Sequence, residues 1–135
     1  MNNTINKEKL LKIIAPLIFI IFGMNFVANK FYWYSSIWYF DMPMHFLGGA
    51  WLSFALIWLF PPKEMSFKYI FKVLLGVLLV GLGWEIFEIL VNHFTIQNLF
   101  NVLDTSSDIC FDLGGGSLAL LYFFKKIMVM EKSAV

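Results

Sequence analysis

The sequence predicts an all-α fold, a polytopic membrane helix bundle with four transmembrane helices, and three observations lead to this prediction. The chain has 135 residues, of which 60% are hydrophobic and 14% are charged. A soluble domain of this length has too little interior to bury so much apolar surface. The apolar residues form runs long enough to cross the roughly 30 Å hydrocarbon core as helices, and the lysines gather in alternate connections. We expect a single transmembrane domain over residues 1–135.

Four segments have the length and composition of spans, and helices are expected because only helices or closed barrels satisfy their backbone hydrogen bonds in lipid. Pro61 and Pro62 end the second span, because proline cannot continue a helix. Lysines precede the first span as in a signal peptide, but no cleavage site of small residues follows, so we expect a retained helix. The spans are expected at about residues 10–28, 43–60, 69–92 and 108–130.

Two connections have a distinctive composition. In Phe31–Phe40, seven of ten residues are Phe, Tyr or Trp. Such residues are enriched where membrane meets water, so we expect a short aromatic segment at the interface. The segment His93–Ser107 mixes polar and apolar residues and is expected to connect the third and fourth spans, with a short interfacial helix as one alternative.

The lysines predict the orientation of the bundle. Nine of the ten lie before the first span, between the second and third, or after the fourth, and only Lys30 lies in the other two connections. Cytoplasmic connections of membrane proteins are enriched in lysine and arginine. We therefore expect a multi-pass protein of the cytoplasmic (plasma, or inner) membrane with both termini in the cytoplasm.

The acidic residues show the opposite distribution. Six of the nine fall near the non-cytoplasmic ends of the second, third and fourth spans, together with both histidines. Residues three or four apart share a helix face, and each of these three spans carries such a pair of ionisable groups next to glycines, which let membrane helices approach closely. We therefore expect the faces to meet. The three pairs are Asp41 with His45, Glu85 with Glu88, and Asp108 with Asp112.

Carboxylates gathered at one end of a bundle without arginine repel one another in a low dielectric. They must be protonated, hydrated or balanced by a cation, and ionisable groups inside membrane spans are usually functional. Carboxylates and imidazole on facing helices form the metal sites of helix bundles, so we predict a divalent metal ion of open identity. The predicted ligands are Asp41, His45, Glu85, Glu88, Asp108 and Asp112, with Asp104 and His93 as additional candidates.

Helix capping offers a structural alternative for some of these acids. Asp41 could be an N-cap with Pro43 in the first turn behind it. Thr105 and Asp108 have the spacing of a capping box for the fourth span. Asp112 lies deeper than any cap. Glu85 and Glu88 lie in the last turns of their helix, where the helix dipole disfavours acids. Function is therefore favoured for these last three residues.

Three blocks of sequence carry a resemblance: Asp41-x-x-x-His45-Phe-x-Gly-Gly, Trp84-Glu85-x-x-Glu88 and Asp104-Thr-x-x-Asp108-x-x-x-Asp112-x-x-Gly-Gly. They resemble small bacterial membrane proteins of the VanZ-like and YjdF-like families over roughly residues 40–120. The resemblance implies a compact membrane domain with acids and histidine in corresponding helices. VanZ is associated with glycopeptide resistance, but this chain lacks the arginine and glutamine positions of that family and has extra acids. The YjdF-like comparison is therefore closer.

Three classes of function fit this pattern. The first is a metal-dependent enzyme acting on a lipid or lipid-linked substrate, in which a carboxylate or His45 would be the general base. The second is a proton- or cation-coupled transporter or ion-binding protein. The third is a structural or partner-binding membrane protein with solvated acids and no metal. Membrane lipids are expected partners and nucleic acid is not, since the chain has no arginine and no basic patch. The pattern leaves the oligomeric state open.

Overall fold

The computed structural model describes residues 7–64, 66–95 and 100–128, and in these ranges the secondary structure is entirely helical. The last long helix continues directly into a π-helical segment, η1. No strand occurs among the described residues, which confirms the predicted all-α class. The elements are α1 (Lys7–Lys30), α2 (Trp33–Ser36), α3 (Asp41–Leu59), α4 (Phe67–Thr95), α5 (Val102–Tyr122) and η1 (Phe123–Met128).

Three of the helices are long and apolar enough to cross a membrane: α1, α3 and α4 up to Phe94. The helix α5 is not among them; it contains Asp104, Asp108 and Asp112. Several apolar spans are therefore present, as the composition predicted. The fourth span stays a prediction.

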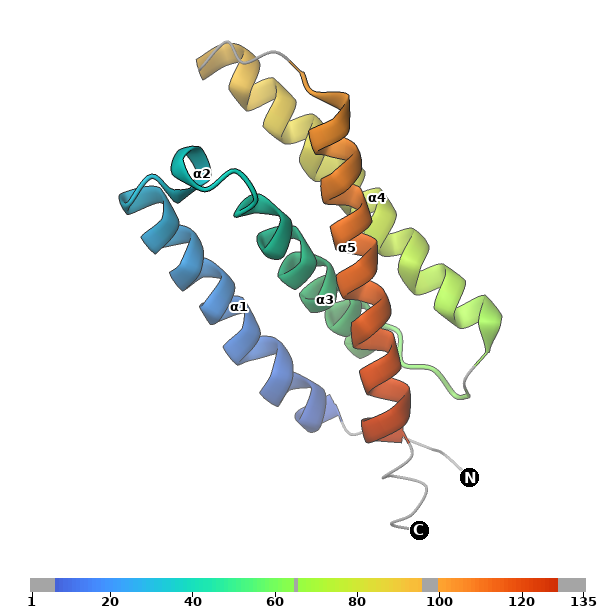
Figure 1. The fold of residues 1–135 in the computed structure, drawn as a ribbon. Helices are drawn as coiled ribbons and strands as arrows, with labels where there is room; N and C mark the ends of the chain where they lie inside the picture. The colour runs from blue at the N-terminus through green and yellow to red at the C-terminus, as the bar shows by residue number, and fades with distance from the viewer. Residues whose placement is uncertain (1–6, 65, 96–99, 129–135) are drawn as a thin grey trace.

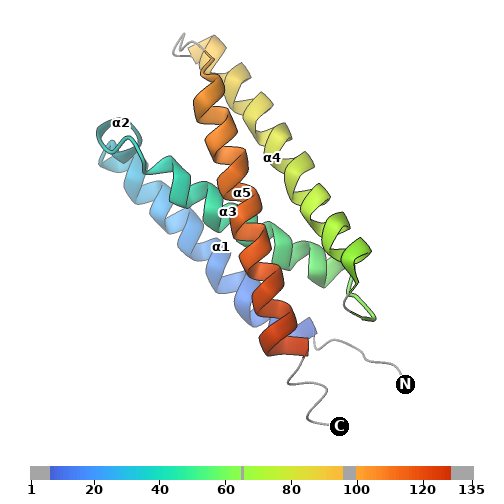
Figure 2. The same ribbon diagram turned by 45° about the vertical axis from the view of Figure 1, so that its right-hand side comes forward.

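The central helix of the bundle is α3, which packs against α1, α4 and α5. Figures 1 and 2 show α5 crossing α3, while α1 lies along the other side of α3. The end of α1, α2, the start of α3, the end of α4 and the start of α5 lie at one end of the bundle. The start of α1, the end of α3, the start of α4 and the end of α5 lie at the other (Figure 1).

This arrangement separates charges of opposite sign. The half of the bundle near α2 carries most of the acids, and we call it the acidic end; it contains Asp41, His45, Glu85, Glu88, Asp104, Asp108 and Asp112. The opposite half is called the lysine end; it contains Lys7, Lys9, Lys12, Lys63, Lys68, Lys72, Lys125 and Lys126. The predicted grouping of the lysines and acids is therefore a property of the fold.

Apolar packing holds the lysine end together. One cluster of buried side chains joins α1, α3, α4, α5 and η1, and Leu10, Ile57 and Phe123 in it have no solvent exposure. The indole of Trp51 also donates a hydrogen bond to the carbonyl oxygen of Ile14, which ties α3 to α1. Burial of this kind comes from tight van der Waals packing, the main force between helices in lipid. Other buried members are Ala50, Phe54, Val73, Ala119, Leu120, Phe124 and Ile127.

Glycines bring α3 and α5 into backbone contact. A side-chain carbon on Gly49 would overlap the backbone carbonyl of Asp112, and one on Gly115 would overlap that of Phe46. Near this crossing the buried hydroxyl of Ser53 donates a hydrogen bond of 3.1 Å to the carbonyl oxygen of Gly116. The predicted close approach at glycines is therefore seen. Gly48, next to one of them, faces open space and takes no part.

Both capping hypotheses are wrong. The helix α5 begins at Val102, well before the predicted boundary at residue 108, and its N-cap is Asn101, whose side chain accepts a hydrogen bond from the amide of Leu103. Thr105 lies inside the helix. At α3 the N-cap position is Phe40, without a side-chain cap, so Asp41 is already helical. Neither Asp41 nor Asp108 caps the N-terminus of a helix, so both are available for another role.

The aromatic segment forms a short helix, α2, between α1 and α3. Tyr32 precedes it in the left-handed backbone region, with φ of 56°. The hydroxyl of Tyr34 donates a hydrogen bond of 2.8 Å to the side-chain oxygen of Asn25 on α1. Trp33 and Tyr34 each meet Phe40 edge to face. These contacts fix α2 at the acidic end of the bundle.

Candidate functional site

The candidate site is centred on His45, a buried residue of α3 with 8% of its surface exposed. Its Nε2 atom lies 3.8 Å from Oδ1 of Asp41 and 3.8 Å from Oε1 of Glu85. Its Nδ1 atom lies 3.4 Å from Oδ1 of Asp112. Because Glu85 comes from α4 and Asp112 from α5, one imidazole ring meets carboxylates of three helices. Such a convergence requires the whole bundle.

Local geometry explains how each helix contributes. Asp41 and His45 are one turn apart on α3, so their side chains share a face. Asp112 reaches the space between α3 and α4 because both neighbours lack side chains. Its backbone lies against Gly49, and a side-chain carbon on Gly81 would lie only 2.7 Å from its Oδ2. The glycines beside the acids therefore make room for them.

One carboxylate oxygen at the site is unsatisfied. Oε1 of Glu85 is buried and has no hydrogen-bond partner among the described residues, and the side chain is only 7% exposed. A buried acceptor without a partner costs about 1–3 kcal/mol, and more when it is charged. This oxygen faces Nε2 of His45, and Asp41 faces the same nitrogen. Oε1 of Glu85 therefore lacks a hydrogen-bond donor or a cation that would compensate its burial.

A pocket of about 100 Å³ opens beside these groups. Its walls come from α3, α4, α5 and the residues just before α5. Among the described residues, five carboxylates line it and no lysine does. The lining residues are Asp41, Glu85, Glu88, Ile89, Asn92, Phe100, Asn101, Asp104, Thr105 and Asp108.

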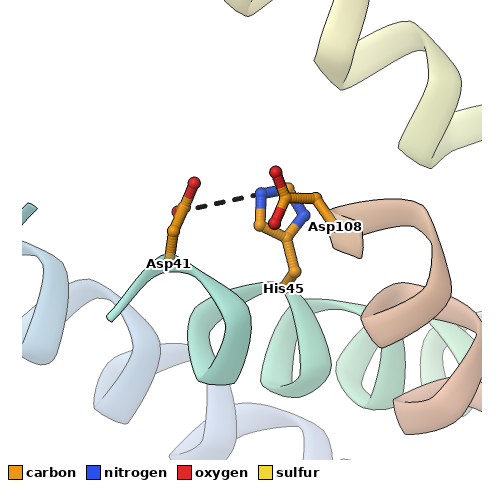
Figure 3. Close-up of side chains that lie close together, drawn as sticks. All are labelled: Asp41, His45 and Asp108. Atoms are coloured by element: carbon orange, nitrogen blue, oxygen red, sulfur yellow. Dashed lines mark ion pairs between the residues drawn. The ribbon is translucent and has the colours of Figure 1, made fainter. Parts of the chain in front are cut away.

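Two overlapping groups of side chains have the spacing to hold a cation. In the first, ligand atoms of Asp41, His45 and Asp108 lie within 4.8 Å of one another; in the second, those of His45, Glu85 and Glu88 do. Figure 3 shows the first group, with Asp41 and His45 projecting from α3 and Asp108 reaching them from α5. Nitrogen and oxygen donors of this kind suit Zn, Mn, Fe or Mg.

With the geometry established, the chain can be compared with known proteins. Residues 3–127 match the family described as "Predicted membrane protein (DUF2238)". The chain belongs to this family. No curated protein and no solved structure matches it. The family establishes a membrane protein and leaves its activity open, so the site must be interpreted from its own residues.

In this member of the family, all six predicted ligands lie around His45 or the pocket beside it. Asp108 and Asp112 are buried, with 3% and 7% of their surface exposed. Asp104, an additional candidate, lines the pocket but is exposed. The other additional candidate, His93, is not brought into the site: it is exposed near the end of α4, with its ring 5.4 Å from that of Phe94.

Sequence reasoning missed other residues at the site. Asn101, Thr105 and Phe100 line the pocket, but only the capping chemistry of Asn101 gave a signal that α5 begins there. Tyr34 belongs to the aromatic segment Phe31–Phe40, for which the sequence predicts only a place at the membrane interface. Partial burial and then the charges of Asp41 and Glu88 raise its pKa to about 12. The phenol is therefore a neutral hydrogen-bond donor beside an acidic pocket.

Proposed function

We propose that this protein binds a divalent cation at the extracytoplasmic end of a four-span bundle, through Nε2 of His45 and the carboxylates around it. The observation that carries the proposal is the buried, unpartnered Oε1 of Glu85, 3.8 Å from that nitrogen. Asp41 and Glu85 are the nearest carboxylates to Nε2, and Glu88 and Asp108 complete the two groups.

A cation explains two features together. It would satisfy the orphan oxygen, and it would offset the repulsion among clustered carboxylates, which is strong in a low dielectric. Bonds of roughly 2.0–2.2 Å to one ion require ligand atoms a few ångströms apart. The ligand atoms of each group lie within 4.8 Å of one another, which is close to that requirement.

We further propose that α5 with η1 is the fourth span, and that the lysine end faces the cytoplasm. The two elements together run from Val102 to Met128, a length of about 40 Å at 1.5 Å per residue, enough to cross the hydrocarbon core. Their aspartates are turned toward α3 and α4, which removes the main objection to placing α5 in lipid. The lysine distribution supports cytoplasmic termini in the plasma membrane.

An enzyme is the activity that this site would serve best. A bound cation lowers the pKa of a coordinated water and polarises phosphoryl or carbonyl oxygens. The pocket also has uncharged polar walls, Asn92, Asn101 and Thr105, that could orient a polar group. In the membrane such a group would belong to a lipid or a lipid-linked molecule. The resemblance to YjdF-like and VanZ-like proteins, which carry acids and histidine in corresponding helices, is consistent with this proposal.

A transporter is the second candidate, and the lysine end argues against it. A conduit needs polar groups along the full length of the bundle. Below the site, the described core is mainly apolar, with side chains such as Phe54, Ile57 and Phe123, and the hydroxyl of its buried Ser53 is bonded to a backbone carbonyl. If purified protein in liposomes conducts protons or cations, and Glu88→Gln abolishes that flux, the transporter replaces the enzyme.

The metal content of purified protein tests the proposal. Wild type, Glu85→Gln and the control Glu64→Gln are purified in detergent without chelators and equilibrated with Zn²⁺ or Mn²⁺. Glu64 is an exposed acid at the lysine end and lies outside the site. We expect one tightly held ion per chain in wild type and the control, and an affinity at least about tenfold weaker in Glu85→Gln. The proposed metal site is rejected if wild type holds no more metal than Glu85→Gln does.

A further inference from the structure

Asp112 differs from the other carboxylates near His45. Asp41, Glu85 and Asp108 line the pocket, and Asp112 does not. Asp112 also lies against the opposite ring atom: its Oδ1 is 3.4 Å from Nδ1, whereas Asp41 and Glu85 approach Nε2. Neither group of potential ligands includes it. The sequence predicts Asp112 as a metal ligand in the same way as the other carboxylates.

The position of Asp112 is fixed by the crossing of the helices. Its backbone carbonyl contacts Gly49 of α3, and Oδ2 lies near the backbone of Gly81 of α4. With 7% of its surface exposed, the residue is buried between three helices on the side of His45 away from the pocket. A carboxylate held in this fixed position can determine which ring nitrogen of His45 carries the proton.

We propose that Asp112 is a positioning residue: its carboxylate accepts a hydrogen bond from the Nδ1–H of His45, which leaves the Nε2 lone pair directed at the cation. The inference rests on the proposed function. A neutral imidazole has one N–H and one lone pair, and the partner of the first decides where the second points. Metal-binding histidines commonly donate their other N–H to a carboxylate, which fixes the ring and raises its basicity.

This assignment is an alternative to the expectation that all six residues are ligands. Asp112 serves the metal through His45, and the direct ligand set is reduced to His45, Asp41, Glu85, Glu88 and Asp108. Loss of a carboxylate that acts through a ligand weakens metal affinity by about 10–100-fold. Its loss leaves the number and type of atoms bonded to the metal unchanged. A lost ligand would change both.

The test uses ¹¹³Cd²⁺ as the probe and ¹⁵N-labelled histidine in the full-length protein in detergent micelles. The chain has two histidines, and the exposed His93 provides an internal reference. In wild type we expect coupling of cadmium to Nε2 of His45 and a proton on Nδ1. In Asp112→Asn we expect one cadmium per chain, an affinity about 10–100-fold lower, and an unchanged cadmium shift. Glu64→Gln, at an exposed acid of the lysine end outside the pocket, is the control and is expected to bind cadmium as wild type does.

Two results would overturn the assignment: coupling of cadmium to Nδ1, or a cadmium shift in Asp112→Asn that indicates the loss of an oxygen ligand. Failure of the proposed function looks different, because wild type would then bind no cadmium at all. Misfolding of Asp112→Asn is recognised by its histidine spectrum without metal. In that case Gly81→Ala, which crowds Oδ2 from the other side, must give the same weakened binding with an unchanged cadmium shift, or the assignment is wrong.

Discussion

The two ends of α3 and α5 are built on opposite principles. At the lysine end, their side chains join a fully apolar cluster in which Ile57 and Phe123 have no exposure. At the acidic end, the same two helices bury His45, Asp108 and Asp112, and α4 adds Glu85, whose buried Oε1 has no hydrogen-bond partner among the described residues. Buried charges of like sign oppose folding, while apolar packing favours it.

The difference indicates a division of work along the bundle. Apolar packing at the lysine end stabilises the fold and offsets the repulsion among carboxylates at the acidic end. Ionisable groups that remain inside a membrane bundle despite their cost in stability usually have a function. Variants at the two ends should therefore affect stability and cation binding separately. The following predictions test that separation, from the largest expected effect to the smallest.

Phe123→Ala should have the largest effect, and it should act on stability alone. The side chain is fully buried in the lysine-end cluster, and removing such a ring costs about 3–5 kcal/mol. The free energy of unfolding is measured by tryptophan fluorescence in mixed micelles. Under conditions where the variant is folded, cation affinity should match wild type. A tenfold or greater loss of affinity would show that the two ends are coupled.

Gly115→Ala should damage both ends, because it acts at the crossing between them. The new methyl group would overlap the carbonyl of Phe46, and overpacking of this kind costs about 1–3 kcal/mol. Cation affinity should fall as α5 moves away from His45. Gly48→Ala is the matched control, since no atom lies within 4 Å of the added carbon. Equal behaviour of the two variants in unfolding and binding assays would contradict the close crossing.

Chelation should destabilise wild type more than it destabilises Glu85→Gln, which binds the cation at least about tenfold more weakly. A cation at a hundredfold excess over its Kd stabilises the state that binds it by about 2.7 kcal/mol. Removing it with a chelator restores the repulsion among the carboxylates. We expect wild type to lose about that much in a thermal or denaturant assay. In the chelated state Glu85→Gln should be at least as stable as wild type, and a less stable variant would mean that this carboxylate has another stabilising partner.

Tyr34→Phe should have the smallest effect, a small loss of stability at neutral pH that shrinks in alkaline solution. The pKa of Tyr34 is raised from 10.0 to about 12 in the folded protein, so folding favours the neutral phenol. Its contribution to stability is therefore complete below pH 10 and is lost as the pH rises toward 12. Tyrosinate absorbance during a titration should show one late-titrating group in wild type that Tyr34→Phe lacks. A difference in stability between the two proteins that grows with pH in this range would contradict the sign.

The sequence predicted the features that depend on local spacing. Lysine placement indicated which helix ends lie together, and the four-residue spacing of Asp41 and His45 correctly placed both on one face. The predicted boundary of the fourth span at residue 108 lies too late in the sequence, because Asn101 caps a helix that already contains Thr105 and the serines before Asp108.

Features that depend on how helices pair could not be predicted. Gly48 and Gly49 are equivalent in the sequence, yet only Gly49 meets α5. Asp108 and Asp112 share a helix face, but one lines the pocket and the other meets the far nitrogen of the imidazole. Those distinctions arise from the rotation and crossing of α5 on α3, which spacing within one helix does not define. His93 shows the same limit, because closeness in sequence to Glu88 did not bring it to the site.

The crossing of α3 and α5 also has a consequence for biogenesis. Asp41 and His45 are translated long before the aspartates of α5, and until then His45 has only its own helix and α4 to face. Gly49 likewise has no partner backbone until Asp112 has been made. The polar cluster can therefore close only when the last helix joins the bundle. A ribosome-bound chain truncated before Val102 should consequently leave its acids open to water or lipid and remain accessible to quality-control proteases.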